Sequence, residues 1–106
     1  NQDPLLVLDE ESRIVIANYS WSELVGIPQE KITGLDFIKS HKTWLIGDEL
    51  QRFLKTTLEH GTEFSTDVLT IRSTKGGEGS YVIKGRVIEG KPVYPYRILL
   101  RFVKQT

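Results

Sequence analysis

The chain has 106 residues, 14 basic and 14 acidic side chains, and a formal net charge of zero. This length accommodates one domain with one hydrophobic core and is too short for two. The balanced charge argues against nucleic acid as a direct partner, because such a surface requires a basic excess or stripe. The sequence contains no cysteine, which excludes disulfides, thiolate metal sites and cysteine nucleophiles. It also contains no apolar stretch of bilayer length, so we expect no direct membrane insertion.

The N-terminal part of the chain changes from strand-like to helix-like periodicity at one polar residue. Residues 4–8 and 13–17 are apolar runs on either side of an acidic turn, which is typical of a β-hairpin. Asn18 follows directly and is predicted to be a helix N-cap, because its side-chain oxygen can accept free backbone N–H groups. The helix that follows, residues 19–25, is expected to end at Gly26.

The central part of the chain is predicted to be helical. Residues 28–32 and 36–41 read as short helical turns, which depend on tertiary packing because they are too short to be stable alone. The strongest helix signal spans residues 48–61, with Asp48 as the expected N-cap and Gly61 as the stop. One apolar stripe follows this helix at helical spacing and comprises Ile46, Leu50, Phe53, Leu54 and Leu58.

The C-terminal part of the chain is predicted to consist of three strands. They occupy residues 63–72, 80–89 and 96–103, and a glycine-rich segment joins the first two. Two strands, a helical block and three further strands predict an α+β domain, with an antiparallel sheet and helices on one face.

This order of elements resembles a PAS domain, the sensor module of many signalling proteins. The resemblance covers nearly the whole chain and rests on LLVLDEESRIVIAN, on LVGIPQEKITGLDFI, and on a long helix before three strands. Two positions depart from the family: Ser12 stands where glycine is common, and the chain ends in VKQT instead of an Asp-Ile-Thr-like junction. The resemblance implies a five-stranded antiparallel sheet with helices across one face. It also implies that residues 1–106 are a single domain of a larger multidomain cytoplasmic signalling protein, such as a histidine kinase of a two-component system.

The family keeps its ligands between the inner sheet face and the helices, and strand alternation and helix periodicity assign side chains to that space. The expected pocket residues are Trp21, Leu24, Phe37, Ile38, Trp44, Phe53, Leu54, Phe64, Val68, Arg72, Tyr81, Ile83, Gly85, Ile98 and Leu100. The same apolar residues could instead fill a solid core, and composition alone does not separate the two interpretations. Gly85 favours open space or a close backbone approach, and Arg72 is the best candidate to contact an anion.

The sequence restricts the cofactor without identifying it. A cysteinyl-flavin adduct is impossible without cysteine, whereas non-covalent flavin binding stays open. Heme is not favoured, because His41 precedes the long helix and His60 lies at its C-terminal end, where it suits the helix dipole. No stretch sets a nucleophile beside a base or places His and Glu at metal-ligand spacing, so we expect neither a metal site nor an enzyme.

The outer sheet face is predicted to carry an apolar patch, which is typical of a partner surface. Its expected residues are Leu69, Ile71, Val82, Ile88, Leu99 and Val103. Two functions follow from these patterns. The first is a sensor that binds a small ligand in its core and relays its state to a neighbouring effector domain of the same chain. The second is a ligand-free module whose outer face mediates homodimerisation or another protein–protein interaction.

Overall fold

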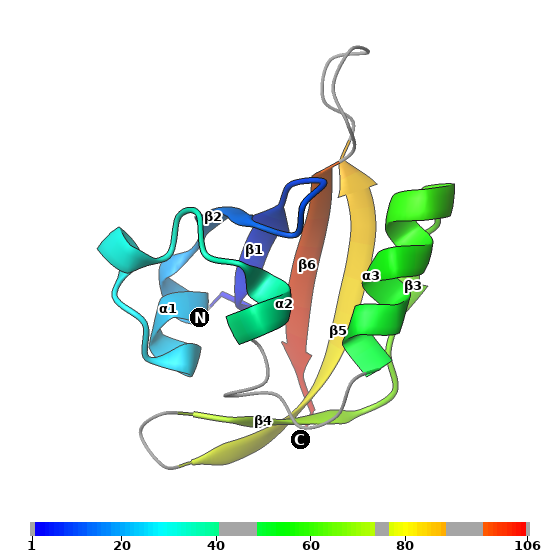
Figure 1. Ribbon diagram of the computed structural model, residues 1–106. Helices are drawn as coiled ribbons and strands as arrows, with labels where there is room; N and C mark the ends of the chain where they lie inside the picture. The colour runs from blue at the N-terminus through cyan, green and yellow to red at the C-terminus, as the bar shows by residue number, and fades with distance from the viewer. Residues whose placement is uncertain (1, 41–48, 74–76, 89–96, 106) are drawn as a thin grey trace.

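One antiparallel sheet with helices across one face forms the core of the computed structural model, which describes residues 2–40, 49–73, 77–88 and 97–105. The strand order is β2-β1-β6-β5-β3, and β4 also pairs with β5. The strands are β1 (Leu5–Leu8), β2 (Ile14–Ala17), β3 (Phe64–Ser65), β4 (Leu69–Arg72), β5 (Glu78–Ile88) and β6 (Arg97–Lys104). The helices are α1 (Tyr19–Val25), the 3-10 turn η1 (Gln29–Lys31), α2 (Phe37–Ser40) and α3 (Glu49–His60). Figure 1 shows α1, α2 and α3 on the same side of the sheet.

Asn18 joins the sheet to the first helix. Its Oδ1 accepts hydrogen bonds from Leu5 N and Trp21 N, both at 3.0 Å, and its Nδ2 donates to Asp3 O at 2.9 Å. The predicted N-cap is therefore confirmed, and the same side chain also holds the start of β1. Helix α1 ends at Gly26, whose φ of 76° lies in the left-handed region that glycine adopts readily.

A β-bulge in β2 decides which of its side chains enter the core. Val7 pairs with Ile16 and Leu8 pairs with Ile14, so Val15 is an extra residue in this strand. Ile14 is consequently buried, whereas Ile16, two residues later, points to the opposite face and is 60% exposed.

A second irregularity separates β3 from β4 and inverts the alternation of the predicted strand 63–72. Ser65 pairs with Lys84 and Leu69 pairs with Tyr81, so residues 66–68 lie opposite only residues 82–83. Thr66 is buried at this point, and its Oγ1 accepts the hydrogen bond from Ile83 N. One extra residue shifts every later side chain to the other face of the sheet.

This shift corrects four predictions made from uninterrupted alternation. Leu69 and Ile71 are buried in the core and not on the outer face. Val68 is 57% exposed and Arg72 is exposed with its Nε 3.5 Å from Glu78 Oε2, so neither lines an interior pocket.

Helix α3 presents the predicted apolar stripe to the sheet. Leu50 and Leu54 are buried, and Phe53 stacks on Phe64 of β3 with ring centroids 5.1 Å apart. Asp48, Ile46 and the Leu58 side chain lie outside the described residues. None of the helices in the described part of the chain is both long and apolar enough to cross a membrane.

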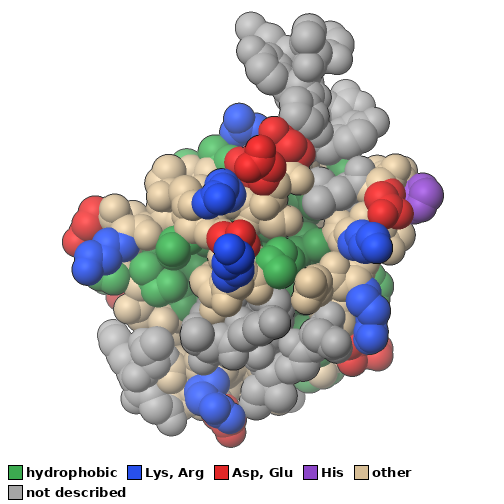
Figure 2. Space-filling model, viewed as in Figure 1, with side chains coloured by type: hydrophobic (Ala, Val, Ile, Leu, Met, Phe, Trp, Pro, Cys, Tyr) green, Lys and Arg blue, Asp and Glu red, His purple; other side chains and the backbone are tan. Residues whose placement is uncertain are grey.

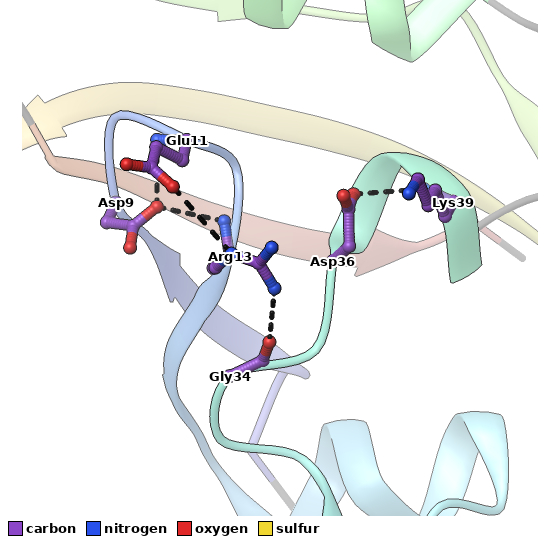
Figure 3. A network of polar contacts seen from close by, with 6 residues as sticks. All are labelled: Asp9, Glu11, Arg13, Gly34, Asp36 and Lys39. Atoms are coloured by element: carbon purple, nitrogen blue, oxygen red, sulfur yellow. Dashed lines mark hydrogen bonds and ion pairs between the residues drawn. The ribbon is translucent and has the colours of Figure 1, made fainter.

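A polar network fixes the β1–β2 turn against the helical segment (Figure 3). Asp9 Oδ1 accepts hydrogen bonds from Glu11 N and Arg13 N, both at 2.9 Å, and an Arg13 guanidinium N–H donates to Gly34 O at 3.1 Å. Backbone bonds continue this connection, since Ile14 N donates to Leu35 O at 2.9 Å. The turn therefore positions the chain that leads into α2.

Ser12 occupies a strained position in this turn. Its φ is 61°, in the left-handed region that costs a residue with a Cβ about 1–2 kcal/mol. Its backbone nevertheless makes two hydrogen bonds: Ser12 N donates to Asp9 O, and Ser12 O accepts from Phe37 N. Serine at position 12, where PAS domains often have glycine, therefore costs stability but leaves the hydrogen bonds of the turn in place.

We predict that Asn18→Ala lowers the free energy of unfolding by roughly 2 kcal/mol, because it removes an N-cap and leaves Leu5 N without its acceptor. Urea denaturation of the two proteins measures the difference. Asn18→Asp is the matched control: it keeps the accepting oxygen, and it replaces the donor to Asp3 O by a carboxylate oxygen, so part of the loss is expected to remain. Equal losses in both variants would contradict the role given to Oδ1.

We predict that Ser12→Gly raises the free energy of unfolding by roughly 0.5–1 kcal/mol, because relief of the left-handed strain exceeds the added entropy of the unfolded chain. Ser12→Ala keeps the Cβ and should give no gain. Thermal and urea midpoints of the three proteins test this expectation. A glycine variant no more stable than the alanine variant would show that the turn is not strained.

Candidate functional site

The predicted interior residues lie together in one hydrophobic cluster between the sheet and the helices. The buried members that the sequence identified are Trp21, Phe37, Leu54, Tyr81, Ile83, Ile98 and Leu100. Leu24, Ile38 and Phe64 are partly buried and pack against this cluster. Trp44 lies outside the described residues. The interior that the PAS resemblance assigned to a ligand is therefore built from the expected side chains, apart from Val68 and Arg72.

Gly85 provides the close approach that its position in β5 suggested. It pairs with Phe64 across the strands, and a Cβ at this position would overlap the Phe64 ring. The ring lies over the glycine and also stacks on Phe53 of α3. An aromatic side chain therefore occupies the space that a larger residue in β5 would fill.

Buried hydroxyl groups in this region are directed at the backbone. Ser22 donates to Ile27 O, Thr57 donates to Thr62 O at 2.9 Å, and Thr66 donates to Asp67 O at 2.7 Å. The sequence did not identify Ser22, Thr57 and Thr66 as interior residues, because serine and threonine are more often exposed than buried. Burial raises the pKa of the Tyr81 phenol above its ordinary value. The described interior is thus mainly apolar and aromatic.

The outer sheet face has an apolar strip across β2, β1 and β6. Val7 pairs with Ile16 on one side and with Leu99 on the other, which places the three side chains in one row. A groove of about 220 Å³ follows this strip and is lined by Leu5, Leu6, Val7, Ile16, Ala17, Asn18 and Leu99. Val82, Leu99 and Val103 share the outer face as predicted. Ile16 was missed because the β2 bulge was not evident from the sequence, and Leu5 and Val7 were missed because the predicted patch took no residue from the first strand.

A second groove of about 520 Å³ lies over β5 and β6 beside this strip. Its lining residues are Glu63, Phe64, Ser65, Lys84, Gly85, Arg86, Leu99 and Arg101. Lys84 and Arg86 are exposed, as the alternation with buried Ile83 and Gly85 requires. Arg101 Nε lies 2.9 Å from Asp3 Oδ2. This groove combines an apolar floor at Leu99 with basic groups around it.

Of the two histidines, the structure describes only His60, which lines neither groove. His60 is exposed in the last turn of α3, with its Nε2 3.7 Å from Glu59 Oε2, and His41 lies outside the described residues. Over the ranges that the structure describes, no three His, Asp or Glu side chains are grouped closely enough to bind a metal ion.

Comparison with solved structures identifies the architecture. The PAS-B domain of Drosophila melanogaster Cycle with bound ethylene glycol matches at a TM-score of 0.73 and 11% identity, over 96% of this chain and 99% of that chain. The PAS domain of an HTR-like protein from Haloarcula marismortui matches at a TM-score of 0.71 and 13% identity, over 97% and 81% of the two chains. A LOV protein of Rhodobacter sphaeroides matches at a TM-score of 0.72 and 18% identity, over 96% of this chain and 58% of that chain.

No protein-family model matches the sequence, and no curated protein matches it. At identities of 11–18% the structural matches, which cover 96–97% of this chain, establish the fold. The resemblance seen in the sequence is confirmed at this level: the chain is a domain with the PAS fold.

Proposed function

We propose that this domain is a sensor that binds a small ligand between the inner sheet face and the helices, and relays its state to a neighbouring effector domain. The observation that carries the proposal is the convergence of α1, α2, α3 and the sheet on one cluster of apolar and aromatic side chains. Small-molecule sites are lined predominantly by side chains of this kind. The similar Cycle PAS-B structure holds bound ethylene glycol, which supports a small-molecule role for a domain of this fold.

The side chains around this region indicate the chemical class of the ligand. Trp21, Phe37 and Ile83 offer apolar and aromatic contacts, while the hydroxyls of Ser22, Thr57 and Thr66 already donate to backbone carbonyls. Arg72 is exposed and cannot neutralise an interior anion. We therefore propose an uncharged ligand, apolar or aromatic in most of its surface. Without cysteine, a cysteinyl-flavin adduct is excluded, and a flavin would bind non-covalently.

The relay would pass through the sheet. Strands β5 and β6 present buried side chains to the cluster and exposed ones to the outer face, so a change in packing on one face alters the other. The ligand would act by stabilising one of two sheet arrangements, which is a population shift. The domain itself would be non-catalytic and cytoplasmic, and its effector could be a histidine kinase.

A ligand-free interaction module is the alternative, and the outer face favours it. Ile16 is 60% exposed and lies in a row with Val7 and Leu99 beside an apolar groove. Exposed apolar strips of this kind mark surfaces that bind partners, including a second copy of the same domain.

We predict that the purified domain retains, or binds in a screen, an uncharged small molecule that raises its thermal midpoint by stabilising the folded state. Native mass spectrometry with an absorbance scan detects a retained molecule, and thermal shift detects a weakly bound one. Ile38→Phe, which adds volume at the edge of the cluster, should abolish the ligand-induced rise.

Val68→Phe is the matched control, because Val68 is 57% exposed and away from the cluster, and the rise should persist in it. A bare apo mass, combined with no rise for any compound, would contradict the sensor proposal. If that apo protein were dimeric, the ligand-free interaction module would replace the sensor as the proposed function.

A further inference from the structure

Basic side chains gather on the outer face of β5 and β6 with no acidic side chain between them. In the paired segments 82–88 and 97–103, the outward positions carry Lys84, Arg86, Arg97 and Arg101 and no acidic residue. On the helical face, in contrast, acidic and basic side chains lie next to one another (Figure 2). The whole chain is neutral, with 14 residues of each sign, so the excess of positive charge is a local feature of this face.

Three hydrogen-bond donors lie in one row across three neighbouring strands. Ser65 of β3 pairs with Lys84 of β5, and Lys84 pairs with Arg101 of β6. All three side chains are exposed, and cross-strand partners have Cβ atoms about 4.5–5.5 Å apart. Arg86 occupies the next outward position of β5. One small area of the sheet therefore presents a hydroxyl, an ammonium and two guanidinium groups.

Most of these donors have no internal partner. Lys84 and Arg101 are direct cross-strand partners, and like charges in that arrangement destabilise a sheet. The Nε of Arg101 lies 2.9 Å from Asp3 Oδ2. Within the part of the chain that the structure describes, the side chains of Lys84, Arg86 and Ser65 take no ion pair or hydrogen bond. An arrangement that costs stability in this way is expected at functional sites.

The donors line the groove of about 520 Å³ over β5 and β6. Leu99 adds an apolar contact, and among the described lining residues Glu63 is the one acidic side chain against three basic ones. Small-molecule sites have volumes of about 300–1,000 Å³ and combine apolar surface with a few placed polar groups. The groove therefore has the size and the lining for a small anion that carries an apolar part.

We propose that this groove binds a phosphate monoester with an apolar or aromatic body. Ser65, Lys84 and Arg101 hold the phosphate group, and the body of the ligand covers Leu99. A phosphate monoester carries a charge of about −1.5 to −2 near pH 7 and three strong acceptor oxygens, which match three donors and an excess of positive charge. The groove is on the face of the sheet opposite the interior cluster, so this second site goes beyond the proposed function.

Asp3 acts as an internal competitor for the phosphate. Its carboxylate contacts the Nε of Arg101, and its backbone oxygen accepts a hydrogen bond from Asn18 Nδ2 at 2.9 Å. The backbone bond keeps the carboxylate beside the groove, where it repels a bound anion. Asp3→Asn removes this charge and should tighten binding of a phosphate monoester by about two- to threefold.

The test uses phenyl phosphate as the probe and follows the backbone amides of the domain by 15N NMR. Benzoate carries a similar ring with one charge, and benzyl alcohol carries none. We expect phenyl phosphate to bind at least about fivefold more tightly than benzoate, to shift the amides around Ser65, Lys84 and Arg101, and to weaken as salt rises. Benzyl alcohol should leave these amides unshifted.

Lys84→Met keeps the length of the side chain and should lose about fivefold or more of the affinity for phenyl phosphate. Lys31→Met/Lys55→Met removes charge at exposed helical positions and should bind like the wild type. Full affinity in Lys84→Met would overturn the site, and equal affinity for benzoate would overturn the assignment to phosphate. An Asp3→Asn variant that binds no more tightly would contradict the competition.

A vesicle experiment distinguishes the two sources of a phosphate monoester. Sedimentation with phosphatidic acid vesicles, lost in Lys84→Met and absent with phosphatidylcholine, would support the site and assign the phosphate to a lipid headgroup. Binding of phenyl phosphate without such sedimentation would support the site and assign it to a soluble ester.

The same variant separates this inference from the proposed function. Lys84→Met removes the like-charge contact with Arg101, so the urea midpoint of the domain should not fall, and a lower midpoint would contradict the repulsion. The rise in thermal midpoint caused by an uncharged interior ligand should persist in Lys84→Met. Loss of phenyl phosphate binding alone therefore reports on the groove, and loss of the interior ligand alone reports on the cluster.

Discussion

The hydrogen bonds of the Asn18 side chain hold the two layers of the domain together. One oxygen accepts from Leu5 N in β1 and from Trp21 N in α1, and the amide donates to Asp3 O. Helix α1 has only seven residues, too few to be stable alone, so its direction depends on this cap and on burial of Trp21 and Val25. The position of α1 in turn determines where the helices meet the sheet and therefore where an interior ligand could lie.

Two single-residue insertions in the sheet decide which side chains face inward. Val15 in β2 turns Ile16 outward, and the extra residue between Ser65 and Leu69 turns Leu69 and Ile71 inward. The first insertion places Ile16 in the apolar strip of the outer face while Ile14 stays in the core, and the second completes the core beneath β4. Both faces of the domain thus depend on places where regular pairing is interrupted.

The interior and the outer face are linked by the strands that they share. In β5 and β6, Ile83, Leu100 and Phe102 are buried in the cluster, and their immediate neighbours Lys84, Leu99 and Arg101 are exposed or half-buried on the other side. A ligand that moved the buried side chains would shift the backbone carrying the exposed ones. This geometry would be the physical basis of the proposed relay from the core to the outer face of the sheet.

The sequence by itself determined the order of helices and strands except for the division of residues 63–72 into β3 and β4. It also determined the Asn18 cap, the inward face of α3 at Leu50 and Leu54, and most of the buried residues, because local periodicity and capping chemistry report directly on those features. Only the tertiary structure decided the faces of residues 66–72 and of Ile16, because a bulge is defined by pairing with a distant strand and leaves no periodic signal. That is why Val68, Leu69, Ile71 and Arg72 were assigned to the wrong faces. It is also why the grouping of Lys84, Arg86 and Arg101 emerged only once cross-strand register was known.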